Sequence, residues 1–433
     1  MREHSRRRRS VGAITAASLS LLLASCSGTG DDSDSVDLSS GAPTGVTITI
    51  WHSSADSQAV LDLYAAYEAV SGNTIELVDI PNDTYTASVQ TKWSTGDRPD
   101  ILEYQPTSQD MAQLNMSENM IDLGALDFVA QEGDLAEVAG SLDGTVYGAV
   151  LGPIQTFGVY YNKLVLTEAG LEAPTSYDEL AEQCDAILGA GATPLFVGGG
   201  SEFPIMMING FTYMADFNTG DEYGTAVKNG DIKVSDEGSP LVAGMTMLTE
   251  LRDAGCLNDD AGTATFQDAV AAVAEGTAAL TVLPSDFIEN FLAAGVDSES
   301  IGFGVISAHD GIAAYAPSVM GSYFAPKTGD DAQERAAVDF IDWITTDGYQ
   351  DYVDAAQIVP TMSNATASEL TGLYADMNDM LTAPGATLAF NSSIPGFGNF
   401  GGISAKVLVG QSTPQEGAEQ FQTFVDQARA AQE

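Results

Sequence analysis

A β-type run near the first third of the chain is broken and resumed at once. Thr145–Leu151 is apolar, Gly152–Pro153 interrupts it, and Phe157–Tyr161 continues it with β-branched and aromatic residues. Such an interruption is unusual inside one sheet, because proline cannot donate to the ladder of hydrogen bonds. It favours a strand that leaves one lobe and enters another. The residues Gly152–Thr156 are therefore predicted to form a hinge between two lobes.

The N-terminus has the pattern of an export signal. Arg6–Arg9 precede a short apolar run, Val11–Leu23, and the run ends in Leu-Ala-Ser-Cys at Cys26. This ending resembles a bacterial lipobox, which predicts a signal peptide over 1–25 and a lipid on Cys26. Residues 26–43 are rich in Ser, Gly and Asp and predict a flexible tether. The predicted location is the extracellular face of the cytoplasmic membrane, with the mature protein anchored by its lipid.

The chain is strongly acidic. It holds 15 Lys and Arg against 61 Asp and Glu, a formal net charge of −46, and five of the arginines lie in the predicted signal. This field repels nucleic acids and phosphates and favours a neutral or cationic ligand. It also favours a saline habitat.

Strand and helix patterns alternate after the tether, and a helix pattern over Ser57–Val70 follows the first strand. The strand patterns cover Val46–Ile50, Thr74–Ile80 and Pro99–Leu102. This order predicts βαβ crossovers and a parallel sheet, where ligands bind beyond the carboxyl ends of the strands. The residues at those ends are Trp51–Ser54 and Glu103–Gln105.

Several stretches together resemble the extracellular solute-binding proteins of carbohydrate ABC importers. The resemblance covers nearly the whole chain from about residue 45. No single stretch is specific to the family, but the order and spacing of the stretches together are a strong indication. The stretches are Thr47–Ser54, Thr91–Leu102, Val159–Leu180, Asp268–Leu283 and Val409–Glu416.

The resemblance implies a periplasmic-binding-protein-like α/β fold: two α/β lobes, a hinge of several crossings and a ligand cleft between the lobes. The crossings are expected near Gly152–Thr156, Ala308–Pro317 and Gln357–Thr361. The expected N-lobe is 44–154 plus 315–357, and the expected C-lobe is 155–314 plus 358–433. The implied function is capture of a neutral mono- or oligosaccharide by hinge closure and its delivery to membrane permease subunits that an ATPase drives. No cofactor and no metal are implied, and the protein is expected to be a monomer that does not bind nucleic acid.

Sugar recognition needs aromatic faces for the C–H faces of the ring and polar groups for its hydroxyls. Loops that offer both supply the predicted ligand residues, some from the strand ends and some by resemblance. They are His52, Ser53, Ser54, Glu103, Tyr104, Gln155, Ser201, Glu202, Phe203, Asp286, Phe287, Ser322, Tyr323 and Phe397. Many family members have a Gly-small-Trp sequence where this chain has Pro284–Phe287, so Asp286 replaces a stacking ring and the ligand could be smaller or more polar.

Two cysteines remain after Cys26. Cys184 lies in a predicted helix and Cys256 follows another, and disulfides persist outside the cell. A Cys184–Cys256 bridge is predicted, with two buried thiols as the alternative.

Catalysis has little support in the sequence. Only three histidines exist, and no nucleophile elbow, phosphate loop or histidine cluster is present. The alternatives that stay open are a binding protein for a polyol or polyamine, a secreted glycan hydrolase, and a sensor that presents sugar to a receptor.

Overall fold

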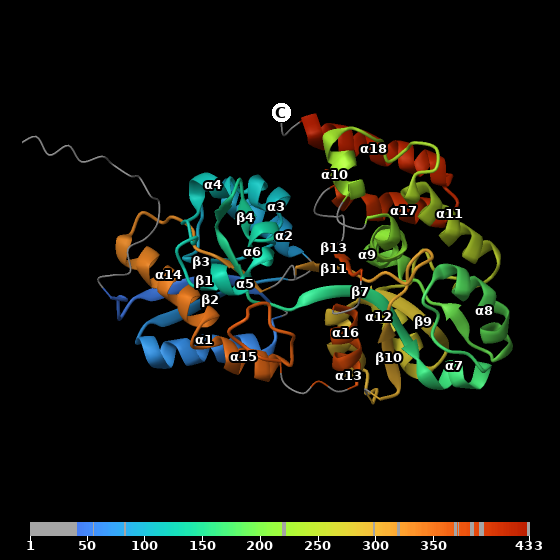
Figure 1. The fold of residues 1–433 in the computed structure, drawn as a ribbon, viewed down its shortest axis with the longest axis horizontal. Coiled ribbons are helices and arrows are strands. Elements are labelled where there is room, and N and C mark those ends of the chain that lie inside the picture. Colours follow the sequence, from blue (N-terminus) through green and yellow to red (C-terminus); the bar gives the residue numbers. More distant parts are fainter. Residues whose placement is uncertain are drawn as a thin grey trace, which may run out of the picture. The chain divides into compact units, whose positions relative to one another are not determined.

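The computed structural model describes two large β-sheets, each with its own helices and core, and a two-stranded hairpin (Figure 1). The described residues are 41–54, 56–81, 84–218, 222–297, 299–317, 321–367, 370, 372–381, 385–388 and 394–430. Among the described helices, none has the length and apolar character needed to cross a bilayer.

The first sheet has the strand order β2-β1-β3-β12-β6. β1 pairs in parallel with β2 and β3, as the strand–helix alternation predicts, whereas β12 returns from far along the chain and pairs antiparallel with β3 and β6. The prediction of a parallel sheet therefore holds for three strands, and the sheet as a whole is mixed. The strands are β1 (Thr47–Ser53), β2 (Thr74–Ile80), β3 (Ile101–Glu103), β6 (Gly148–Val150) and β12 (Ser322–Phe324).

Helix α1 (Gln58–Ser71) shows why the sequence forms these elements. Ser57 caps its first turn by accepting a hydrogen bond from the N–H of Val60, and Gly72 ends it in a left-handed conformation. Its apolar face packs with α14 (Asp331–Thr345) and α15 (Tyr349–Ala356), which lie beside it in Figure 1. The other elements of this lobe are α2 (Tyr85–Ser94), α3 (Ser108–Gln113), α4 (Met116–Asn119), α5 (Phe128–Glu132), α6 (Asp134–Val138) and the hairpin β4 (Ser141–Leu142)–β5 (Thr145–Val146).

The second sheet is built around β7 (Ile154–Asn162), with the order β13-β11-β7-β9-β8 and β10 as a further partner of β7. β9, β10 and β11 all run antiparallel to β7. The residues of β7 are almost all buried because helices cover the sheet. The other strands are β8 (Thr193–Leu195), β9 (Ala278–Pro284), β10 (Ile301–Gly304), β11 (Ala314–Pro317) and β13 (Thr387–Leu388).

The helices of the second lobe end with α18 (Pro414–Ala430), which begins at a reciprocal cap between Thr413 and Glu416. It packs on α11 and α17. The remaining helices are α7 (Lys163–Ala169), α8 (Tyr177–Gly189), η2 (Gly199–Ser201), α9 (Phe203–Met206), η3 (Met207–Thr212), η4 (Tyr213–Phe217), α10 (Glu222–Asn229), α11 (Pro240–Asp253), α12 (Phe266–Glu275), η6 (Ser285–Phe287), α13 (Ile288–Ala293), α16 (Leu373–Leu381), η8 (Phe397–Asn399) and α17 (Phe400–Leu408).

The chain passes from the first sheet to the second between Val150 and Ile154, across the interrupted strand. Two expected boundaries differ from the structure. β11 pairs with β7 through Pro317, so the return to the first sheet comes after Pro317 and not at 314/315. Ile358 and Met362 pack in the core of the first lobe, so the last crossing comes after 362 and not at 357/358.

Hydrogen bonds tie the crossing segments to one another on the side of the first sheet. The Thr361 hydroxyl donates to the carbonyl of Val150 at 2.6 Å. The backbone N–H groups of Leu151 and Gly152 both donate to the carbonyl of Gly321 at 2.8 Å. Segments distant in sequence therefore meet at one place.

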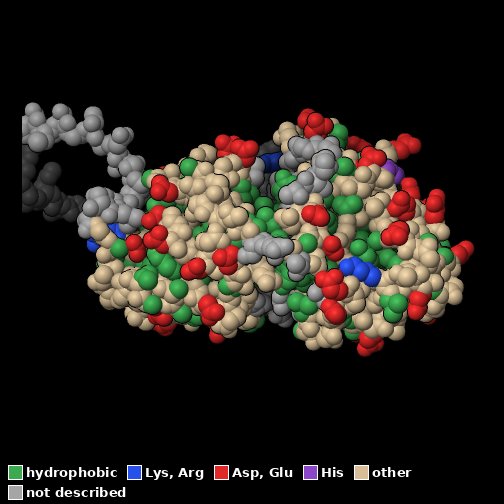
Figure 2. Space-filling model, turned by 60° about the horizontal axis from the view of Figure 1, so that its bottom comes forward, with side chains coloured by type: hydrophobic (Ala, Val, Ile, Leu, Met, Phe, Trp, Pro, Cys, Tyr) green, Lys and Arg blue, Asp and Glu red, His purple; other side chains and the backbone are tan. Residues whose placement is uncertain are grey.

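Acidic side chains are spread over the face seen in Figure 2, with few basic ones among them. This distribution agrees with the net charge of −46 and leaves little cationic surface on this face for an anionic partner.

Candidate functional site

Glu103 lies at the end of β3 and is buried. Its Oε1 accepts a hydrogen bond from the N–H of Gly321 at 2.7 Å, and its Oε2 accepts one from the N–H of Ser53 at 3.2 Å. Burial, together with the charge of Asp56, raises the pKa of Glu103 well above its usual value, and the two N–H groups oppose that rise. The side chain joins β1, β3 and the segment before β12.

His52 is buried at the end of β1 between two carboxylates. Its Nδ1 lies 2.9 Å from Asp56 Oδ2, and its Nε2 lies 2.7 Å from Asp79 Oδ1. Burial lowers the pKa of His52, but the hydrogen bonds and charges of Asp56 and Asp79 raise it by more, so the net shift is upward. The predicted neighbour Ser54 is exposed, and its N–H donates to the carbonyl of Ile80.

Two predicted aromatic contacts of the first lobe lie in its core. The ring of Tyr104 is 0 % exposed, and its hydroxyl lies 3.4 Å from Gln90 Nε2. Tyr323 is also 0 % exposed, and its hydroxyl bonds that of Tyr64 at 3.0 Å. Ser322 is buried beside it. None of these three offers a ligand an open face in this structure, and their role as ligand contacts stays a prediction.

Gln155 and Asp286 form a polar pair in the second lobe. Gln155 lies on β7, and its Nε2 donates to Asp286 Oδ2 at 2.6 Å. Asp286 is exposed to solvent, yet enough protein surrounds it to raise its pKa to about 6, against the lowering effect of the Gln155 hydrogen bond. The structure thus brings together two predicted residues that lie far apart in sequence.

The loop that carries Asp286 is fixed to β7 by further hydrogen bonds. The hydroxyl of Tyr160 donates to the carbonyls of Pro284 at 3.1 Å and Ser285 at 2.8 Å. The N–H of Thr156 donates to the Ser285 hydroxyl at 3.1 Å. The carboxylate of Asp286 is therefore held in place before any ligand arrives.

Three phenylalanine rings meet beside this loop. Phe203, Phe266 and Phe287 contact one another pairwise, with centroids 5.1–5.5 Å apart, and all three are partly exposed. Ser201 supports the group, because its hydroxyl accepts a hydrogen bond from the N–H of Phe266 at 3.0 Å. The sequence prediction missed Phe266. Its place at the first position of α12, after the cap Thr265, could have indicated it.

The side chain of Glu202 lies beside Gly402 of α17. Its backbone has φ +59° and ψ −47°, a strained region for a residue with a side chain. An open groove of about 490 Å³ lies beside it, and Glu202 is the one predicted ligand residue that lines it. The other lining residues are Asn399, Gly402, Ile403, Lys406, Gln420, Thr423 and Phe424.

Phe397 is buried in the core of the second lobe. Its ring stacks with Phe211 and Phe400, with centroids 5.4 Å apart in each pair. The helices α17 and α18 pack against η8, which carries this residue. Phe397 packs in the core in this structure, and its role as a ligand contact stays a prediction.

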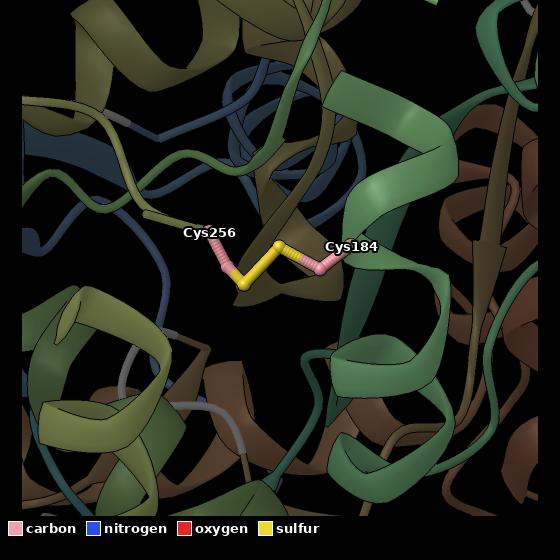
Figure 3. The surroundings of a disulfide bond; sticks show 2 residues. All are labelled: Cys184 and Cys256. Atoms are coloured by element: carbon pink, nitrogen blue, oxygen red, sulfur yellow. A yellow bond between two sulfur atoms is a disulfide. The ribbon is translucent and has the colours of Figure 1, made fainter. Parts of the chain in front are cut away.

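Cys184 on α8 and Cys256 after α11 form a disulfide, with Cα atoms 5.7 Å apart (Figure 3). The predicted lipidation residue Cys26 lies outside the described residues. Within the described part, no cluster of three or more His, Cys, Asp or Glu side chains is placed to hold a metal ion.

The family model for bacterial extracellular solute-binding proteins matches residues 62–379. The chain belongs to this family. As the sequence predicted, it is a binding protein and not an enzyme, and its family places it outside the cytoplasm. YcjN of Escherichia coli K12, named as an ABC transporter periplasmic-binding protein, is 32 % identical over 152 residues. That match covers 32 % of this chain and about a third, 34 %, of the relative.

Solved structures of sugar-binding proteins share the two-lobed fold, as the sequence predicted. A chitin oligosaccharide binding protein aligns with a TM-score of 0.76 at 21 % identity, covering 89 % of this chain and 99 % of its own. The solute-binding protein RafE in complex with raffinose aligns with a TM-score of 0.72 at 18 % identity, covering 89 % of this chain and 100 % of its own. A sugar transporter protein of Bacillus licheniformis in complex with stachyose aligns with a TM-score of 0.69 at 18 % identity, covering 88 % of this chain and 100 % of its own.

Proposed function

We propose that this protein is the sugar-binding subunit of an ABC importer, anchored by a lipid on Cys26. The observation that carries the proposal is the family match together with a shared fold over about nine-tenths of the chain with proteins that bind oligosaccharides. The acidic surface is compatible with an uncharged or cationic solute and unfavourable for an anionic one.

The proposed binding face in the second lobe is the Gln155–Asp286 pair with the three phenylalanine rings. The rings supply apolar faces for the C–H groups of a sugar, and the amide and carboxylate supply acceptors and a donor for its hydroxyls. From the first lobe, we propose that the exposed residues beyond β1, including Ser54, reach the same solute. The buried residues Glu103 and Tyr104 support that edge from beneath.

The proposed mechanism is closure of the two lobes around the solute. A sugar that contacts both lobes has more contacts in the closed state, so binding shifts the population toward it. The closed form is then recognised by the permease subunits, which an ATPase drives.

Thermal unfolding of the mature protein tests the proposal against a panel of neutral and charged mono- and oligosaccharides. A bound sugar at about 100 times its Kd adds about 2.7 kcal/mol to the free energy of unfolding, which raises the Tm by several degrees. A panel without any stabilising sugar contradicts the proposal. Turnover of a labelled oligosaccharide would instead point to a glycan hydrolase.

A further inference from the structure

The carboxylate of Asp286 has no positive partner in the part of the chain that the structure describes. Its hydrogen-bond partner is the neutral amide of Gln155, and among the described residues no lysine or arginine forms an ion pair with it. No positive charge contributes to the shift of its pKa, which rises to about 6 because surrounding protein disfavours the charged form. A carboxylate can accept several hydrogen bonds, so acceptor sites remain for a ligand.

The loop geometry keeps this negative charge in a fixed position. Two residues of β7 hold the residues just before Asp286. The Tyr160 hydroxyl bonds the carbonyls of Pro284 and Ser285, and the Thr156 N–H bonds the Ser285 hydroxyl. Asp286 therefore does not have to be ordered by the ligand, which lowers the cost of binding.

The rings beside Asp286 suit a cation as well as a sugar ring. Phe287 is the next residue, and its ring centroid lies 5.5 Å from that of Phe203 and 5.1 Å from that of Phe266. Ammonium groups are attracted to aromatic faces, and cages of aromatic rings bind quaternary ammonium ligands. A neutral hydroxyl would bond to Asp286 but would leave its charge uncompensated.

We propose that the solute is a sugar bearing a protonated amine, with the Asp286 carboxylate as the partner of its ammonium group. The inference rests on the proposed function and narrows it to one chemical class. The strongly negative field of the molecule acts in the same direction, since it raises the local concentration of cationic solutes.

Isothermal titration calorimetry of the mature protein at about pH 6.5, where the amine and much of Asp286 are charged, tests the inference. The probes are a glucosamine oligosaccharide with free amines, its N-acetylated form and the corresponding glucose oligosaccharide. Choline is a fourth probe that carries a cation without a sugar ring. We expect the free amine form to bind most tightly, by about 10- to 100-fold, the range for hydrogen bonds to charged groups.

Asp286→Asn removes the charge and keeps the shape. It should remove that preference, so that the free amine oligosaccharide and its N-acetylated form bind the variant with similar affinity. The matched control is Asp185→Asn on α8, where an exposed carboxylate without a hydrogen bond among those described is neutralised in the same way. It should bind like the parent protein, and the ranking of the four probes on the parent is informative even where Asp286→Asn folds poorly.

The outcomes separate the inference from the function beneath it. Equal or tighter binding of the neutral sugars overturns the inference and leaves a sugar-binding protein. Choline binding as tight as that of the amino sugar overturns it too, because the sugar ring would then contribute nothing. An amine preference that survives Asp286→Asn overturns the role of Asp286. Failure of every sugar contradicts the proposed function itself.

Discussion

Two glutamates of this protein occupy positions that cost folding free energy, and the rest of the fold compensates for that cost. Glu202 keeps a backbone conformation that suits glycine, and Glu132 is a carboxyl buried beneath β6. The Oε1 of Glu132 accepts the N–H of Val150 at 2.7 Å, while its buried Oε2 has no hydrogen-bond partner in the structure. Both positions lie next to segments that the proposed function uses, and each gives a measurable prediction.

Replacing Glu202 with glycine should stabilise the protein relative to replacing it with alanine. Glycine adopts a positive φ without strain, whereas alanine keeps the Cβ that disfavours it. We expect Glu202→Gly to exceed Glu202→Ala by about 1 kcal/mol in the free energy of unfolding, measured by urea denaturation. Comparing the two variants removes the effect of losing the carboxylate. An alanine variant as stable as the glycine variant would show that the backbone is not strained here.

Glu132→Gln should change how stability depends on pH. Burial raises the pKa of Glu132 to about 8, against the hydrogen bond from Val150, which lowers it. The folded state therefore holds a proton that the unfolded state releases above about pH 4.3, so this group stabilises less as pH rises from about 4.3 to 8. The free energies of unfolding of parent and variant should diverge by up to about 5 kcal/mol across that range, with the variant gaining.

Urea unfolding of both proteins at several pH values measures this difference. The other titrating groups are common to both chains and cancel in the comparison. Parallel curves between pH 5 and pH 8 would contradict a buried protonated carboxyl at this position.

Features that depend on residues within one turn of each other could be predicted from the sequence. Features that depend on contacts between segments far apart in the sequence could not. The ends of α1 and the start of α18 follow from Ser57, Gly72 and the Thr413–Glu416 cap, all of which act within one turn. Tyr104 was predicted as a ligand contact because it follows a strand. It is buried in a cluster that includes Phe324 of β12, which lies more than two hundred residues later and pairs beside β3.

The candidate site divides in the same way. Gln155 and Asp286 were each predicted as ligand residues, but their hydrogen bond depends on the pairing of β7 with β9, which no local pattern specifies. Phe266 was missed because its contact with Phe203 and Phe287 arises from three separate segments.

The disulfide should contribute strongly to the stability of the second lobe. It joins α8 to the segment after α11, across 72 residues of sequence. Replacing both cysteines with serine should lower the free energy of unfolding by about 3–5 kcal/mol, mainly because the unfolded chain becomes less constrained. Denaturant titration of the double variant against the parent measures the loss, and reduction of the parent should reproduce it. A loss below 1 kcal/mol in both experiments would contradict this.

At the scale of the whole molecule, repulsion between like charges should make stability depend on salt. The net charge is −46, and the few basic side chains cannot pair with most of the acidic ones. Raising sodium chloride from about 0.05 M to 0.5 M shortens the screening length from more than 10 Å to a few ångströms. We expect the Tm to rise by several degrees, while an equal osmolality of a neutral solute gives a smaller change. A Tm that is flat or falls with salt would oppose both this expectation and the predicted saline habitat.

The bonds among the crossing segments have a mechanical consequence. Val150, Gly321 and Thr361 are tied together at the edge of the first sheet, through the hydrogen bonds of Leu151, Gly152 and the Thr361 hydroxyl. Segments fastened at one end cannot slide past each other there. We therefore expect the hinge to lie beyond these hydrogen bonds, in the few backbone torsions between Gly152 and Ile154 and in the matching torsions of the other two crossing segments. The second lobe would then rotate as a rigid body about a short hinge axis.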